Sequence, residues 1–65
     1  MTVIFYDVRR ETYARVENVE QLTADQMKIG GRLTNVWLLF PADGSEPSAY
    51  QQKFYNIHRI EEKRC

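Results

Sequence analysis

The 65-residue chain contains one cysteine, one histidine and no net charge. A single cysteine, Cys65, excludes a disulfide within the chain, and Cys65 with His58 supplies too few soft ligands for a structural zinc site. A chain this short forms one domain, whose core rarely contributes more than about 3–5 kcal/mol of net stability. Small domains of this kind usually rely on disulfides, a metal or another chain. We therefore expect a homo-oligomer that holds no metal and no cofactor.

Charge and hydrophobicity restrict the class of partner and the cellular location that we expect for the protein. Nine basic side chains balance nine acidic ones, whereas a general nucleic-acid binder normally has a basic excess. No basic N-terminal segment precedes a long apolar run, and no stretch is long enough to span a membrane. We expect no membrane partner and a cytoplasmic location.

The residues able to carry catalysis are few and poorly placed for it. His58 is the only histidine, and Ser45 and Ser48 follow none of the motifs that expose a nucleophile. Glu61 and Glu62 are neighbours, so in a strand they point to opposite faces and form no acid–base pair. These observations predict a protein that is not an enzyme.

Residues 2–8 are rich in β-branched and aromatic side chains and predict a strand that is apolar on both faces. A second strand is expected from Thr12 to about Val19, with a bulge or strand end near Asn18, where the apolar spacing changes from two to three. Further strands are predicted over 33–40, 49–55 and briefly near 57–60.

Residues 24–29 are ambiguous. Thr23–Gln26 match the capping-box pattern and Gly30 follows as a C-terminal cap, which together predict a short helix from Ala24 to Ile29. The alternative, which we favour, is a short strand over 26–29 that ends in a Gly30-Gly31 hairpin turn. In that case Met27 and Ile29 face the core, with Val36 across from them.

These segments predict an all-β fold. The expected architecture is a strongly bent five-stranded antiparallel sheet, or a small SH3-like or Sm-like barrel, with one short helix at 24–29 as the variant. We expect a single domain over residues 1–62 and a frayed tail over residues 63–65.

The aromatic residues exceed what one face of a small sheet can bury, and tyrosine and tryptophan are favoured at interfaces. The sequence leaves open whether these aromatic residues lie in the core or at an interface. The interface candidates are Tyr6, Trp37, Tyr55, Tyr13 and Tyr50.

The basic residues give rise to two further hypotheses. In the first, the basic residues bind nucleic-acid phosphates while interleaved tyrosines stack on the bases. In the second, the basic residues alone bind a small anion or nucleotide between subunits. Acidic residues are interspersed among them, which favours an ordinary mixed surface. The candidates are Arg9, Arg10, Arg15, Arg32, Lys53 and Arg59.

The chain opens with the predicted strand over 2–8 and closes with the segment Ile57–Glu61. In these features it resembles small one-domain β proteins encoded by phages, prophages and other bacterial mobile elements. The resemblance implies a protein that acts by occupying a partner, such as an inhibitor of a host protein. Taken together, the leading hypothesis is a homo-oligomeric, non-enzymatic binding protein whose partner is another protein.

Overall fold

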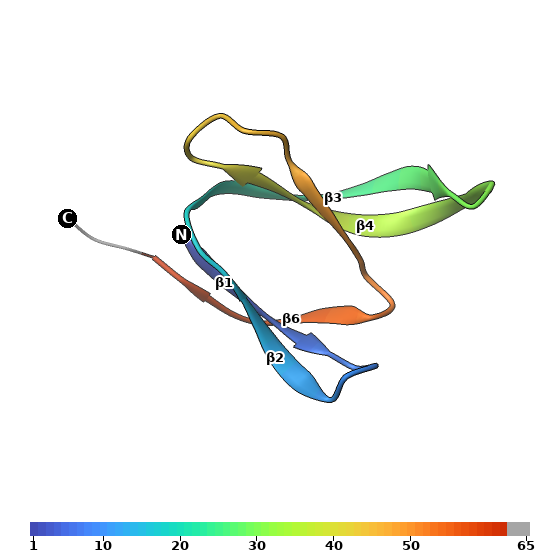
Figure 1. Cartoon of the computed structure of the whole chain (residues 1–65), viewed down its shortest axis with the longest axis horizontal. Coiled ribbons are helices and arrows are strands. Elements are labelled where there is room, and N and C mark those ends of the chain that lie inside the picture. The colour runs from blue at the N-terminus through green and yellow to red at the C-terminus, as the bar shows by residue number, and fades with distance from the viewer. Residues whose placement is uncertain (63–65) are drawn as a thin grey trace.

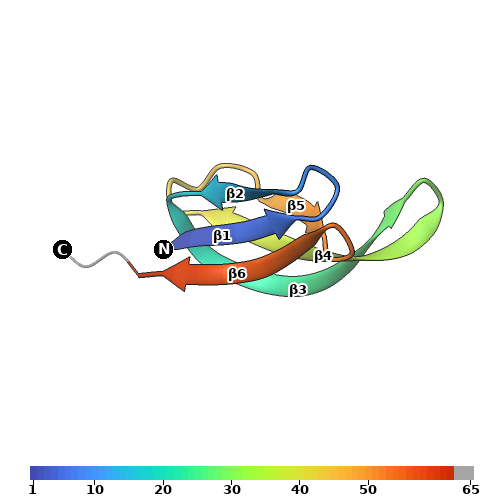
Figure 2. The same ribbon diagram turned by 90° about the horizontal axis from the view of Figure 1, so that it is seen from below.

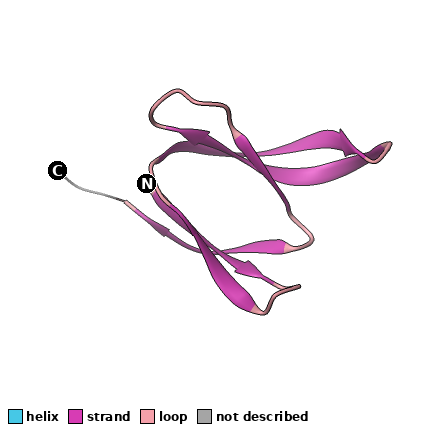
Figure 3. Ribbon diagram, viewed as in Figure 1, coloured by secondary structure: helices cyan, strands magenta, loops and turns pink. Residues whose placement is uncertain are grey.

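The computed structural model describes residues 1–62 and folds them into β-strands, with no helix among them (Figures 1 and 3). The all-β prediction is therefore confirmed. The strands are β1 (Thr2–Asp7), β2 (Thr12–Val16), β3 (Val19–Ile29), β4 (Arg32–Pro41), β5 (Ser48–Gln51) and β6 (Tyr55–Glu61).

The strands form two antiparallel sheets of three strands each, in the orders β2-β1-β6 and β3-β4-β5. Figure 2 shows the two sheets lying over one another. The expected single five-stranded sheet is wrong, because the chain leaves the first sheet after β2 and starts a second one. The tail expected over 63–65 lies outside the described residues.

The chain passes between the sheets at Glu17-Asn18. Asn18 has a left-handed backbone with φ of 62°, a conformation that asparagine adopts more readily than most residues. Immediately after it, the Val19 N–H donates to the Met1 carbonyl at 2.9 Å, and the Met1 ammonium donates to the Val19 carbonyl at 2.6 Å. The predicted strand end near Asn18 is confirmed, and it is the corner of the fold.

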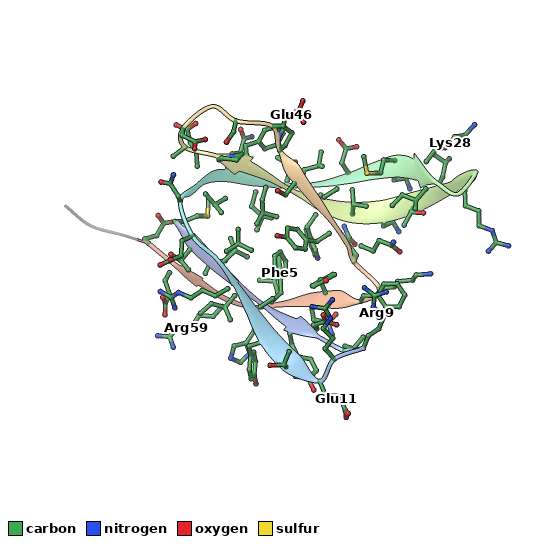
Figure 4. All side chains as sticks on the ribbon, viewed as in Figure 1. Phe5, Arg9, Glu11, Lys28, Glu46 and Arg59 are labelled. Atoms are coloured by element: carbon green, nitrogen blue, oxygen red, sulfur yellow. The ribbon has the colours of Figure 1, made fainter. Side chains whose placement is uncertain are left out.

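The main core cluster lies between the sheets and is made of Val3, Phe5, Val19 and Leu39, each at most 2% exposed, and Val36 is fully buried outside this cluster. Phe5 from β1 stacks on Tyr50 from β5 with ring centroids 5.0 Å apart. Because β1 and β5 belong to different sheets, this ring contact helps to tie the two layers together. Figure 4 shows Phe5 pointing into the space between them.

Residues 24–29 belong to β3, so the helix variant is wrong and the strand that we favoured is confirmed, as is its Gly30-Gly31 turn, where φ is 59° and 81°. The strand is longer than expected and continues without a turn from Val19. Met27 and Ile29, expected in the core, are 39% and 37% exposed. They miss the core because strand alternation points them to the face of β3 opposite to core-packed Leu22, and because the β3–β4 hairpin extends beyond the core as an arm (Figure 1).

The strand predicted over 49–55 is interrupted. β5 ends at Gln51, and the Phe54 N–H donates to the Gln51 carbonyl at 3.1 Å, which closes a turn before β6 begins at Tyr55. The Val8 N–H donates to the Phe54 carbonyl at 3.0 Å and fastens this turn to the end of β1. Residues 1–62 include no helix that could cross a membrane.

Two leucines allow a matched test of where the core lies. Leu39 is 1% exposed and Leu33 is 70% exposed. Leu39→Ala is expected to lower the free energy of unfolding by about 2–5 kcal/mol, because it leaves a cavity in the core. Leu33→Ala is expected to change it by no more than about 0.5 kcal/mol. Urea unfolding followed by Trp37 fluorescence measures both, and equal losses would contradict the core described above.

Candidate interaction surface

The structure divides the aromatic residues into two groups on opposite sides of the β2-β1-β6 sheet. The inner group packs between the sheets: Tyr55 meets Phe5 with centroids 5.8 Å apart and Tyr50 at 5.1 Å. The Trp37 indole N–H donates to the Tyr55 carbonyl at 3.0 Å. Three of the five interface candidates, Trp37, Tyr50 and Tyr55, thus contribute to holding the sheets together.

The outer group follows from strand alternation. In β1, Val3, Phe5 and Asp7 are buried and point inward, so Ile4 and Tyr6 point outward. Directly opposite residues of an antiparallel pair share a face. The register pairs Tyr6 with Tyr13 of β2, which places both tyrosines outside.

The outer rings touch one another. Tyr6 and Tyr13 meet edge to face with centroids 5.2 Å apart, and the His58 ring lies 4.8 Å from Tyr13. Tyr13 is 58% exposed. The tyrosine face, as we name this surface, comprises Ile4, Tyr6, Tyr13, Arg15, His58 and Arg59.

His58 reaches this face through a β-bulge. Ile4 pairs with Arg59 but Phe5 pairs with Ile57, so His58 is the extra residue between them. His58 was not among the interface candidates predicted from the sequence. The signal for its place was absent from the local sequence, because a bulge depends on the register of the neighbouring strand.

The two arginines of the tyrosine face are paired with carboxylates. Glu61 lies 3.6 Å from an Arg15 terminal nitrogen and 3.4 Å from Arg59 Nε, and Glu17 lies 3.6 Å from Arg15 Nε. All four side chains are at least one-third exposed, so these pairs are weak and solvated. Their effect is to leave the rim polar and close to electrically neutral.

The other basic candidates lie at the opposite end of the molecule, as the positions of Arg9 and Arg59 show (Figure 4). The Arg9 guanidinium lies 3.9 Å from the Phe54 ring centroid, and Lys53 Nζ lies 4.9 Å from it. Arg10 Nε is 3.9 Å from the buried carboxylate of Asp7. The six basic candidates therefore form two separate groups rather than one patch.

Two open hollows mark the described surface. One, of about 600 Å³, adjoins the tyrosine face and carries three carboxylates, which disfavour an anionic ligand. Its lining residues are Met1, Thr2, Arg15, Glu17, Asn18, Glu61 and Glu62. The other, of about 470 Å³, is lined by Arg32, Lys53, Leu33, Thr34, Asn35 and Gln52.

Residues 1–62 contain no group of three or more histidine, cysteine, aspartate or glutamate side chains placed to hold a metal ion. No protein-family model matches the chain, and comparison with curated proteins and with solved structures gave no match.

The inner aromatic group makes stability sensitive to alkaline pH. Burial raises the pKa of Tyr50 above its ordinary value of 10.0, and the neighbouring Tyr55 raises it further. The folded state therefore retains the Tyr50 proton at pH values where the unfolded chain has lost it. This contribution is complete below a pH of about 10 and is lost as the pH rises through the folded-state pKa.

Tyr50→Phe removes that dependence. We expect the free energy of unfolding of the wild-type chain to fall more steeply above a pH of about 10 than that of Tyr50→Phe. Urea unfolding at a series of pH values measures the two slopes. Identical slopes would contradict the raised pKa of Tyr50 in the folded state.

Proposed function

We propose that this protein is a non-catalytic interaction module that occupies another protein through the tyrosine face and also associates with itself. The observation that carries the proposal is the placement of Tyr6, Tyr13 and His58, in mutual contact, on the outward side of a sheet whose inward side already has a core. Exposed aromatic clusters beside arginines are typical of the residues that dominate binding at protein interfaces.

The charges around the tyrosine face favour a protein over a nucleic acid. A nucleic-acid surface needs cations that are free to neutralise phosphates, and Arg15 and Arg59 already face Glu17 and Glu61. A protein surface, in contrast, accepts a polar rim of mixed sign around an aromatic centre. The resemblance to phage and mobile-element proteins implies that the partner is a regulatory or defence protein of a bacterial host.

A small anion is the second candidate ligand, at a different place. Arg32 and Lys53 line one open hollow, which is the feature that favours it. Inorganic phosphate and nucleotides are suitable probes in a thermal-shift assay. A rise in melting temperature that Lys53→Ala removes would establish this site, and no rise at millimolar ligand would exclude it.

The tyrosine face is tested by truncating its most exposed ring. A partner captured from a bacterial lysate and then purified is titrated calorimetrically with wild-type protein, Tyr13→Ala and Leu33→Ala. We expect Tyr13→Ala to weaken binding by about 30-fold or more, since central interface aromatics contribute about 2 kcal/mol or more. Leu33→Ala changes a residue outside the face that is even more exposed than Tyr13, and it is expected to bind like wild type.

Two results would contradict the proposal. One is a protein partner whose affinity is the same for Tyr13→Ala as for wild type. The other is capture of RNA or DNA alone, with an affinity that falls steeply with salt, which would indicate binding through phosphates instead.

A further inference from the structure

Strand β3 is an open edge of the β3-β4-β5 sheet. Among residues 1–62 its sheet partner is β4, and only Val19, at its start, also bonds to Met1. Every residue from Ala24 to Ile29 is exposed. An edge of this length presents N–H and C=O groups in a row, which is a template for pairing with another strand.

The hairpin turn determines which backbone groups face outward. Gly30-Gly31 is a two-residue turn, so the flanking Ile29 and Arg32 exchange hydrogen bonds within the hairpin. The backbone N–H and C=O groups of successive residues in a strand point to alternate sides, and the pairing of β3 with β4 is regular from Gln21 to Ile29. The residues whose N–H and C=O point away from β4 are therefore Leu22, Ala24, Gln26 and Lys28.

A contact in the structure agrees with this assignment. The Gln26 N–H donates to the carboxylate of its neighbour Asp25 at 2.8 Å, and that bond is exposed. An amide directed at β4 would be used in the ladder, so this one faces solvent. The carboxylate occupies the position that the carbonyl of an added strand would take.

We propose that β3 pairs antiparallel with β3 of a second copy, with the two-fold axis at Ala24, so that two sheets join into one across a dimer. The proposal deepens the self-association named above and rests on it. In this register Ala24 pairs with Ala24 of the partner subunit, and Leu22 pairs with Gln26 of the partner subunit twice by symmetry. The outward groups of these three pairs supply roughly six main-chain hydrogen bonds, two for each pair.

Charge selects this register over its neighbour. With the axis at Ala24, Asp25 lies opposite Thr23 of the partner subunit, and this happens twice by symmetry. Both residues lie in the regular part of β3, and the Thr23 hydroxyl is a donor for the carboxylate. An axis at Asp25 would place two carboxylates directly opposite one another, which is destabilising.

Ala24→Pro tests the pairing with little disturbance of the monomer. Its N–H points away from β4, so proline removes no bond of the β3–β4 ladder, and proline is tolerated on edge strands. Analytical ultracentrifugation over a range of concentrations is expected to show a dimer for wild type and a monomer for Ala24→Pro. Circular dichroism checks that the variant retains its strands.

A charge-reversal cycle tests the register and does not depend on proline. Thr23→Asp places like charges opposite one another at two sites, each beside Asp25 of the partner subunit, and is expected to raise the dimer Kd by about three- to tenfold. The double variant Thr23→Asp with Asp25→Lys makes the facing charges opposite and is expected to return the Kd to that of wild type or below. Failure of the double variant to recover would overturn the axis at Ala24.

A wild-type chain that stays monomeric at the highest concentration, or a dimer that Ala24→Pro leaves intact, would overturn the β3 pairing. Neither result bears on the tyrosine face, which lies on the other sheet and is tested by Tyr13→Ala. Conversely, a Tyr13→Ala variant that binds its partner like wild type would contradict the tyrosine-face proposal and leave the ultracentrifugation result unchanged. The two failures are therefore distinguishable.

Discussion

The exchange of hydrogen bonds between Met1 and Val19 determines the layout of this molecule. Asn18 turns the chain out of the first sheet, and the reciprocal bonds to Met1 hold the beginning of β3 against the beginning of β1. Val19 is thereby directed into the core, where it is 2% exposed. Because the second sheet begins at this corner, β4 and β5 lie over the inner side of β1.

One consequence is the division of the aromatic residues. Covering the inner side of β1 encloses Phe5 between Tyr50 and Tyr55, and the Trp37 indole adds a hydrogen bond from the second sheet to β6. These rings are needed for stability in a domain with so small a core. The rings on the other side of β1 are not used in this way, and their contact with solvent is what makes Tyr6 and Tyr13 candidates for binding.

Another consequence is that the β3–β4 hairpin extends beyond the core as an arm. The β3–β4 hairpin is longer than the layer beneath it, since the other sheet contributes only short strands at that end, and its outer residues have no core to enter. Met27 and Ile29 are exposed because they lie on this extension and on the face of β3 opposite to Leu22, which packs against the core. The same extension leaves the outer edge of β3 accessible along residues 24–29.

The features of this fold that the sequence predicts depend on adjacent residues, and the features that it does not predict depend on pairing between distant strands. The all-β composition, the break near Asn18 and the Gly30-Gly31 turn were predictable, because each depends on the preferences of a few adjacent residues. The location of Trp37 and Tyr55, in the core or at an interface, was left undecided, since tyrosine and tryptophan contribute to both. The bulge that brings His58 to Tyr13 was not predictable at all, because it depends on pairing between β1 and β6.

The central claim is that the outward side of the β2-β1-β6 sheet binds a partner while the inward side holds the fold. Backbone amide shifts of isotopically labelled protein, recorded by NMR during titration with the purified partner, test it directly. The account predicts that the largest changes fall on β2, on Ile4 and Tyr6, and on the bulge at His58. Changes centred on the arm, or on the turn that carries Lys53 and Phe54, with the tyrosine face unaffected, would contradict it.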